Sequence, residues 1–401
     1  MGAHLSRRSR AGALAAAVVA LVLLLASCSS GEHESGDDSP AAGASDEAAD
    51  GHSGHTGAAR PAASAPLRAG ERRLTLEMPE PYTPSPPTQK ATDDYRCFLL
   101  DPRLQDDTFV TGTDVLPGNP NVVHHVILFR VPPEQVAEAE QMDDATEGQG
   151  WTCFGDSGLE TGGDLNDAPW LGAWAPGGRE SVLRAGYGAP MERGSRIVMQ
   201  VHYNLLAGDG EDVSATRLRV APAEADLTPL TTMLLPAPVE LPCRPGRRDN
   251  PLCDRDAALA DLSERVGYAG AADWLHVLCG SPVRASQETT CERRIERPMT
   301  VLGAAGHMHL LGKEIRIEVN RGTPRARTLL DIPVWNFDDQ SSRPVRDARL
   351  RPGDRVRVTC RHSQTIRDKI PAFEGQPDRY VVWGEGTSDE MCLGLLQVAS
   401  S

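Results

Sequence analysis

Short apolar or alternating segments recur along the chain from about residue 74 to the C-terminus, and turns rich in Gly, Pro, Asn and Asp separate them. Segments of this length and spacing are typical of β-strands joined by tight turns. They cover residues 122–131, 196–204, 216–220, 299–304, 314–319, 354–360 and 380–383. The pattern therefore predicts an all-β protein of the β-sandwich type.

One segment has the pattern of a helix instead. Residues 254–265 are rich in Ala, Leu and acids, with apolar positions at Ala257, Leu259 and Leu262 and at Val266 directly after the segment. The segment lies in a Cys-rich stretch, residues 243–291, which we interpret as a short helical insertion. We expect this insertion to shape or cover a binding cleft.

The ordered part of the chain is too long for one small domain and suits two domains of about 150 residues each. We place the N-terminal domain at residues 72–225 and the C-terminal domain at residues 226–401. Residues 28–71 consist mostly of Gly, Ser, Ala, Pro and acids. Such a segment buries too little apolar surface to fold, so we expect a disordered tether.

The N-terminus has the pattern of an export signal. A basic segment at residues 7–10 precedes an apolar run over residues 11–25, which is too short to span a membrane comfortably. The run ends in Leu-Ala-Ser-Cys, the form of a bacterial lipobox, with Cys28 as its last residue. We expect cleavage after residue 27 and a lipid on Cys28, which would place the protein outside the cytoplasm on the cell membrane. The alternative is an ordinary signal peptide with an incidental Cys28.

The net charge limits the partners of the protein. The formal charge is −15, and residues 1–27 carry three Arg and no acid, so the mature chain would have a charge of −18. Nucleic acid and anionic lipid both require a basic face, so neither is an expected partner. Contact with the membrane is expected through the lipid alone.

The cysteines predict disulfides. Without Cys28, eight remain, and an even number in an exported chain favours disulfide bonds. None has the C-x-x-C spacing of a zinc or redox site. Cys360 with Cys392 and Cys279 with Cys291 are candidate pairs, but the sequence leaves the connectivity open. Metal chemistry would then depend on His and Met.

The predicted N-terminal domain contains a His pair and a single His that could bind a metal. His124 and His125 are adjacent, and adjacent residues of a regular strand point to opposite faces. One metal ion could take both rings only if the strand begins irregularly or contains a bulge. His202 lies on the same face as Gln200 in the predicted strand 196–204. A hydrogen-bonded structural His202 is the alternative to a ligand.

Two further elements lie in the second half. His307 and His309 form a His-x-His motif, which in a strand would place both rings on one side, roughly 6–7 Å apart at Cα. Met391 follows two acids and precedes Cys392. A thioether is a soft ligand that favours Cu(I), whereas zinc sites rarely use one. Core packing is the alternative role for Met391.

Together these motifs resemble one family, the copper type II, ascorbate-dependent monooxygenases, which include peptidylglycine hydroxylating and dopamine β-monooxygenases. The matching elements, in the family's order, are His-His before an apolar strand, Gln-Val-His-Tyr, His-x-His-x-Leu-Gly and Asp-Glu-Met-Cys. The resemblance covers the chain from about Tyr95 to the C-terminus. It implies two jelly-roll-like antiparallel β-sandwich domains that face each other across an open, hydrated cleft.

The resemblance also implies the ligands and the chemistry. One copper would be held by three His and the other by two His and a Met, with a disulfide beside the Met. The corresponding residues are His124, His125 and His202, then His307, His309 and Met391, with Cys360 and Cys392 as the disulfide. The three-His copper would store an electron, and the His-His-Met copper would activate O2 to hydroxylate a substrate C–H bond.

The implied partners are a small-molecule substrate, O2 and ascorbate or a similar reductant, and we expect a monomer. The alternative function is a non-catalytic, extracytoplasmic copper-binding or delivery lipoprotein. A ligand-binding lipoprotein with incidental His is a further alternative. The peptide-amidating members carry an Arg two residues before His-x-His and Asn and Tyr after Met-Cys, where this chain has Ala305, Leu393 and Leu395. These apolar replacements favour a neutral or less polar substrate.

Overall fold

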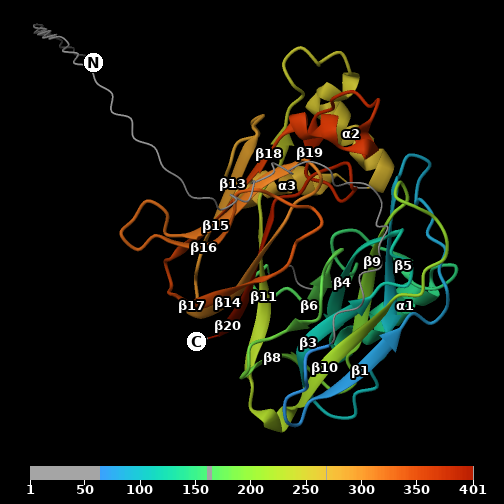
Figure 1. Cartoon of the computed structure of the whole chain (residues 1–401), viewed down its shortest axis with the longest axis vertical. Coiled ribbons are helices and arrows are strands. Elements are labelled where there is room, and N and C mark those ends of the chain that lie inside the picture. The colour runs from blue at the N-terminus through green and yellow to red at the C-terminus, as the bar shows by residue number, and fades with distance from the viewer. Residues whose placement is uncertain (1–63, 160–164, 268, 401) are drawn as a thin grey trace, which may run out of the picture. The chain divides into compact units, whose positions relative to one another are not determined.

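The computed structural model describes residues 64–159, 165–267 and 269–400 (Figure 1). The predicted export signal, Cys28 and the His of the predicted tether lie outside these residues. In the described part of the chain, no helix has the length and apolar character needed to cross a membrane.

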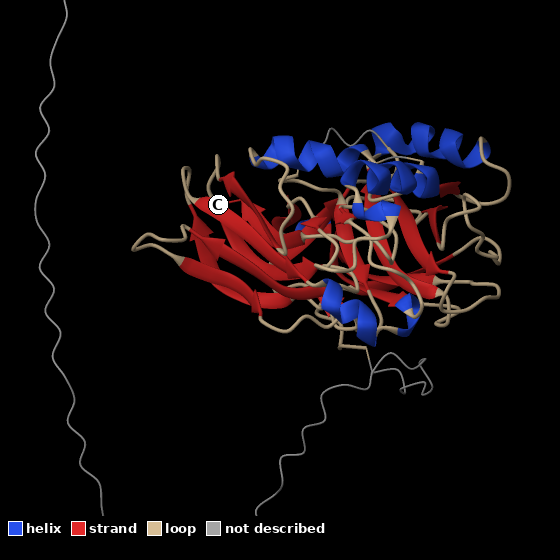
Figure 2. Cartoon of the chain, turned by 90° about the horizontal axis from the view of Figure 1, so that it is seen from above, coloured by secondary structure: helices blue, strands red, loops and turns tan. Residues whose placement is uncertain are grey.

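The fold is all-β, as the spacing of apolar segments predicted (Figure 2). In the N-terminal half, one sheet has the order β5-β2-β9-β4-β6, and it packs against β1, β10, β3 and β8. Phe98, Leu128, Met199 and Leu218 are buried in the core between the two layers. The strands of this half are β1 (Arg72–Glu77), β2 (Asp93–Leu100), β3 (Thr108–Leu116), β4 (Val123–Val131), β5 (Trp151–Thr152), β6 (Trp170–Trp174), β7 (Ser181–Val182), β8 (Tyr187–Met191), β9 (Arg196–Asn204) and β10 (Ala215–Pro222).

The C-terminal half repeats the sandwich arrangement. A layer with the order β11-β20-β14-β17 packs against a sheet with the order β13-β18-β15-β16. Val301, Ile317, Val358 and Leu396 are fully buried between them. The strands of this half are β11 (Thr228–Pro236), β12 (Glu240–Leu241), β13 (Glu288–Arg294), β14 (Met299–His307), β15 (Gly312–Val319), β16 (Arg327–Ile332), β17 (Arg343–Leu350), β18 (Arg355–His362), β19 (Val381–Val382) and β20 (Leu393–Ser400).

The two halves share a sheet. A short parallel pairing joins β8 to β11, through Thr228 with Tyr187 and Pro229 with Gly188. The other pairings between named strands in the described residues are antiparallel. The turn between β10 and β11 contains Asp226, the predicted domain boundary, in the left-handed conformation with φ 50°.

The helical insertion is present. The predicted helix 254–265 corresponds to α2 (Arg255–Val266), and Asp254 caps it by accepting a hydrogen bond from the Ala257 N–H. A second helix, α3 (Gly270–Cys279), follows it. Among the described residues, the remaining α-helix is α1 (Val136–Asp144), and the 3₁₀ turns are η1 (Pro133–Gln135), η2 (Ala223–Ala225), η3 (Pro251–Cys253), η4 (Gln364–Lys369) and η5 (Pro371–Phe373).

Disulfides brace both halves. In the described residues the eight Cys form four bonds, which are Cys97–Cys153, Cys243–Cys253, Cys279–Cys291 and Cys360–Cys392. The last two are the candidate pairs from the sequence, and the second and third bracket the helical insertion.

The ordered fold starts before residue 72. The Arg219 side chain is buried at 1% exposure, and its guanidinium donates hydrogen bonds to the carbonyls of Ala65 and Pro66. A buried guanidinium needs acceptors, and this part of the chain provides them. The end of the predicted tether is therefore bound to the sheet.

Candidate metal centre

The adjacent pair His124 and His125 lies at an irregular start of β4. The pairing of β4 with β9 shifts register between Val123 and His125, so His125 pairs with His202 and His124 is the extra residue. This is the irregularity that an adjacent His pair needs to direct both rings to one place. The β4 and β9 segments thus bring His124, His125 and His202 together, and we call these residues the three-His group.

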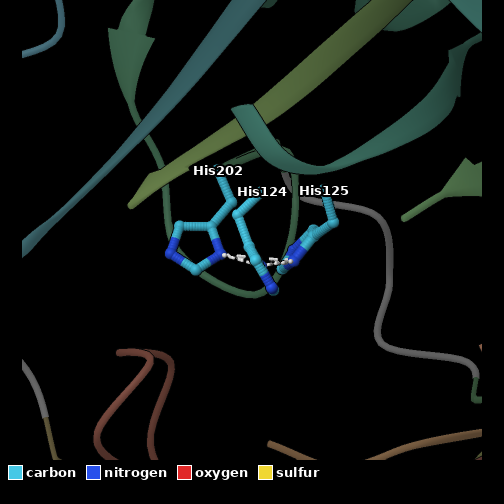
Figure 3. A group of neighbouring side chains, drawn as sticks. All are labelled: His124, His125 and His202. Carbon is cyan, nitrogen blue, oxygen red and sulfur yellow. Dashed lines mark hydrogen bonds between the residues drawn. The ribbon is translucent and has the colours of Figure 1, made fainter. Parts of the chain in front are cut away.

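The three rings meet through their Nδ1 atoms (Figure 3). Each of the three Nδ1–Nδ1 distances is 3.2 Å. The centre of a triangle with these sides lies about 1.8 Å from each corner, close to the ~2.0–2.1 Å of a metal–imidazole bond. His124 and His202 are buried and His125 is partly buried, and the group is able to hold one metal ion.

Burial keeps the His124 and His125 rings neutral. Burial, and then the neighbouring rings, hold the pKa of His124 and His125 well below the usual value. A neutral imidazole retains the lone pair that a metal needs. These two rings therefore need not lose a proton before an ion binds at neutral pH.

Asp93 fixes the orientation of His202. Its Oδ1 lies 2.8 Å from His202 Nε2, so Nε2–H donates to the carboxylate and Nδ1 presents its lone pair to the group. Burial acts to raise the pKa of Asp93, but hydrogen bonds from His202, Thr387 and Thr92 outweigh it and lower the pKa. The Tyr95 ring stacks on the His202 ring, with the two ring centroids 4.0 Å apart.

His307 and His309 form a second cluster, but not within one strand as predicted. His307 is the last residue of β14, and His309 lies in the turn before β15. Their ring centroids are 5.1 Å apart. His307 Nδ1 lies 2.6 Å from Gln340 Oε1, and His309 Nδ1 lies 3.2 Å from the Asp389 carbonyl. With Nδ1–H donating to these oxygens, each ring carries its lone pair on Nε2.

In the second cluster His309 is buried, His307 is partly buried, and both rings are neutral. Burial, and then His309, lower the pKa of His307 to about 3, and burial likewise lowers the pKa of His309. His309 Nε2 is buried and has no hydrogen-bond partner among the described residues. A buried lone pair without a donor costs free energy, and a bound metal ion would satisfy it.

The segment that carries Met391 is bound to the turn that carries His309. Glu390, which is fully buried, accepts hydrogen bonds from the backbone N–H groups of His309 and Leu311. His362 Nε2 lies 3.0 Å from the Met391 carbonyl. We call His307, His309 and Met391 the His-His-Met group.

The two groups are in direct contact. The ring centroids of His125 and His307 are 5.7 Å apart, and Phe337 stacks on His124 at 4.5 Å. Asp93 Oδ1 also accepts hydrogen bonds from the backbone and hydroxyl of Thr387. The two halves are therefore in contact beside both groups.

A cavity of about 860 Å³ lies next to the contact between His125 and His307, and residues of both halves line it. Its lining includes His125, His307 and Met391. It also includes the three apolar replacements, Ala305, Leu393 and Leu395, and β14 pairs with β20 so that Ala305 faces Leu395 and His307 faces Leu393. The replacements therefore lie in the wall of the cavity next to a candidate ligand.

Some functional residues have no signal in the sequence. Asp93, Gln340 and Tyr95 each contact a candidate ligand, but they lie far from it along the chain. His276, a further His of the C-terminal half, belongs to neither group, because its Nε2 lies 3.0 Å from Glu240 Oε1.

Comparisons with known proteins do not extend this picture. No family model and no curated protein matches the chain. One similar solved structure is that of allantoicase, with 13% identity, 79% of this chain and 90% of that chain covered, and a TM-score of 0.18. Another is the infectious bursal disease virus VP2 subviral particle, with 8% identity, 85% and 75% covered, and a TM-score of 0.19. Likenesses this weak carry no argument.

Proposed function

We propose that this protein is a copper- and ascorbate-dependent monooxygenase that hydroxylates a substrate C–H bond with O2. The observation that carries the proposal is the buried three-His group, whose nitrogens are spaced for one metal ion. The His-His-Met group beside it, and the order of motifs shared with the copper type II monooxygenases, add a second candidate position.

The donor set favours copper over other metals. Imidazole suits copper and zinc, but a thioether is a soft donor that selects Cu(I). The three-His group would hold one copper through its Nδ1 atoms. His307 and His309 would hold the other through Nε2, together with the Met391 sulfur.

Copper bound at these positions supplies one-electron exchange and reactivity towards O2. One atom of O2 enters the C–H bond to give C–OH, and two electrons and two protons reduce the other atom to water. Ascorbate supplies the two electrons. The protein's own residues position the ligands: Asp93 orients His202, Gln340 orients His307, and Glu390 holds the His309 backbone beside Met391.

The cellular setting belongs to the same proposal. An export signal ending in a lipobox would place the protein outside the cytoplasm, anchored through a lipid on Cys28. We expect it to act there as a monomer on a small-molecule substrate.

The test is ascorbate-dependent O2 consumption by the purified protein loaded with copper. The proposal predicts O2 consumption that rises when a small-molecule substrate is added, and a rate near background for a zinc-loaded sample. A His309→Ala variant keeps the three-His group and should lose the activity. Copper binding without O2 consumption above background would instead favour the non-catalytic copper-binding function.

A further inference from the structure

The helical insertion forms part of the wall of the cavity. Leu262 and Val266 of α2 and Trp274 and Leu275 of α3 line the same cavity as Met391. The remaining wall includes further apolar side chains from both halves, among them Trp170, Leu234, Leu393 and Leu395. The cavity therefore places an apolar surface beside the His-His-Met group.

The insertion is bound to the loop that precedes the candidate ligand Met391. The Arg265 guanidinium of α2 donates to both carboxylate oxygens of Asp389, at 2.6 and 3.0 Å, and both side chains are buried. The Asp389 carbonyl in turn lies 3.2 Å from His309 Nδ1. Two disulfides bracket the helices as well. The wall is thus held in a fixed position relative to the candidate ligands.

Two exposed charged residues of opposite sign, Arg179 and Asp339, line the cavity, and its other charged lining residues are the acids Asp156, Glu180 and Glu385. Burial, and then Asp156, raise the pKa of Glu385 to about 8, so its carboxyl is mostly protonated at pH 7. Burial also raises the pKa of Asp156. Glu180, another lining acid, is paired with Arg73 at 3.3 Å.

We propose that this cavity binds a neutral small molecule with a largely apolar body, and that the α2–α3 insertion forms the wall that selects it. The cavity volume of about 860 Å³ lies within the range of small-molecule sites. The inference rests on the proposed function, since this molecule would be the substrate of the monooxygenase. A neutral ligand with an apolar body fits this cavity because the apolar wall can desolvate it and no side chain has to balance a charge.

The first test uses a neutral fluorescent probe, N-phenyl-1-naphthylamine, whose emission rises in apolar sites. We expect saturable binding to the metal-free protein and at least fivefold weaker binding to Trp274→Ala. Val277→Ala is the matched control, because Val277 lies on the same helix, is 80% exposed and does not line the cavity. Absence of saturable binding, or equal weakening in both variants, would overturn the proposal.

The second test addresses charge. Displacement of the probe by 1-octanol is compared with displacement by octylammonium, which has the same chain and a positive charge. We expect 1-octanol to displace the probe at least fivefold more effectively. Stronger displacement by octylammonium would refute the neutral class and assign Asp156 and Glu385 to a cation.

The two proposals fail separately. Probe binding is measured without metal, so a protein that binds the probe but neither holds copper nor consumes O2 would keep the cavity proposal and lose the monooxygenase. If the protein is an active copper enzyme but Trp274→Ala binds the probe as tightly as the unchanged protein, only the cavity proposal fails.

Discussion

The carboxylate of Asp93 offers the sharpest test of how the three-His group is built. It accepts a hydrogen bond from His202 Nε2 at 2.8 Å and others from Thr387 and Thr92. Asp93→Asn keeps the size of the side chain but removes its charge and one acceptor. His202 then loses the partner that keeps its Nδ1 lone pair directed at the group.

The expected effect is on metal affinity. Removing a partner that orients a ligating His typically weakens metal binding about 10–100-fold, which corresponds to about 1.4–2.7 kcal/mol. Asp94→Asn is the matched control. Asp94 is the next residue and is equally buried, but it binds Tyr82 and Ser85 instead of a His.

Competition with a chromophoric Cu(I) chelator measures this affinity. A His309→Ala background limits the signal to the three-His group. We expect Asp93→Asn to weaken binding at least tenfold and Asp94→Asn to change it less than threefold. Equal effects of the two variants, or no effect of either, would refute the assignment of Asp93 as the residue that orients His202.

Two further predictions concern stability. Burial raises the pKa of Glu385 to about 8, so its protonated form stabilises the fold below pH ~4.5, and this stability is lost as the pH rises through 8. In denaturant titrations at several pH values, Glu385→Gln should reduce this loss of unfolding free energy by about 2–4 kcal/mol. A parallel pH dependence in both proteins would contradict it. Arg265→Met leaves Asp389 buried without its partner and should cost about 3–5 kcal/mol of unfolding free energy. Arg316→Met, which breaks an exposed pair with Asp331, should cost less than about 1 kcal/mol, and equal losses would show that burial is not the cause.

Local patterns predicted much of the fold. The alternation over residues 196–204 matches β9 at both ends, because one face of that strand packs into the core and the other carries Gln200 and His202. The helix α2 was predicted from its composition and apolar spacing, and the structure adds its Asp254 cap. The helix α3 was not, because no side chain caps its N-terminus and it begins at Gly270.

The residues that complete the candidate site were harder to predict. Asp93 is 109 residues from His202, and Thr387 is 294 residues from Asp93, so their contacts depend on how the two halves pack. The end of β14 at His307 was also missed, since the turn that carries His309 is held by Glu390 from a distant segment. Nor did the pattern predict the parallel pair of β8 with β11, which joins the halves in one sheet.

The most direct test of the central claim is the copper content of the purified protein, measured by elemental analysis and Cu(II) EPR, beside a Met391→Ile variant. The account predicts two coppers per chain. The variant should retain one firmly bound copper at the three-His group and hold the other weakly, because it lacks the thioether. No stoichiometric copper after reconstitution, or a variant that binds both coppers as tightly as the native protein, would contradict it.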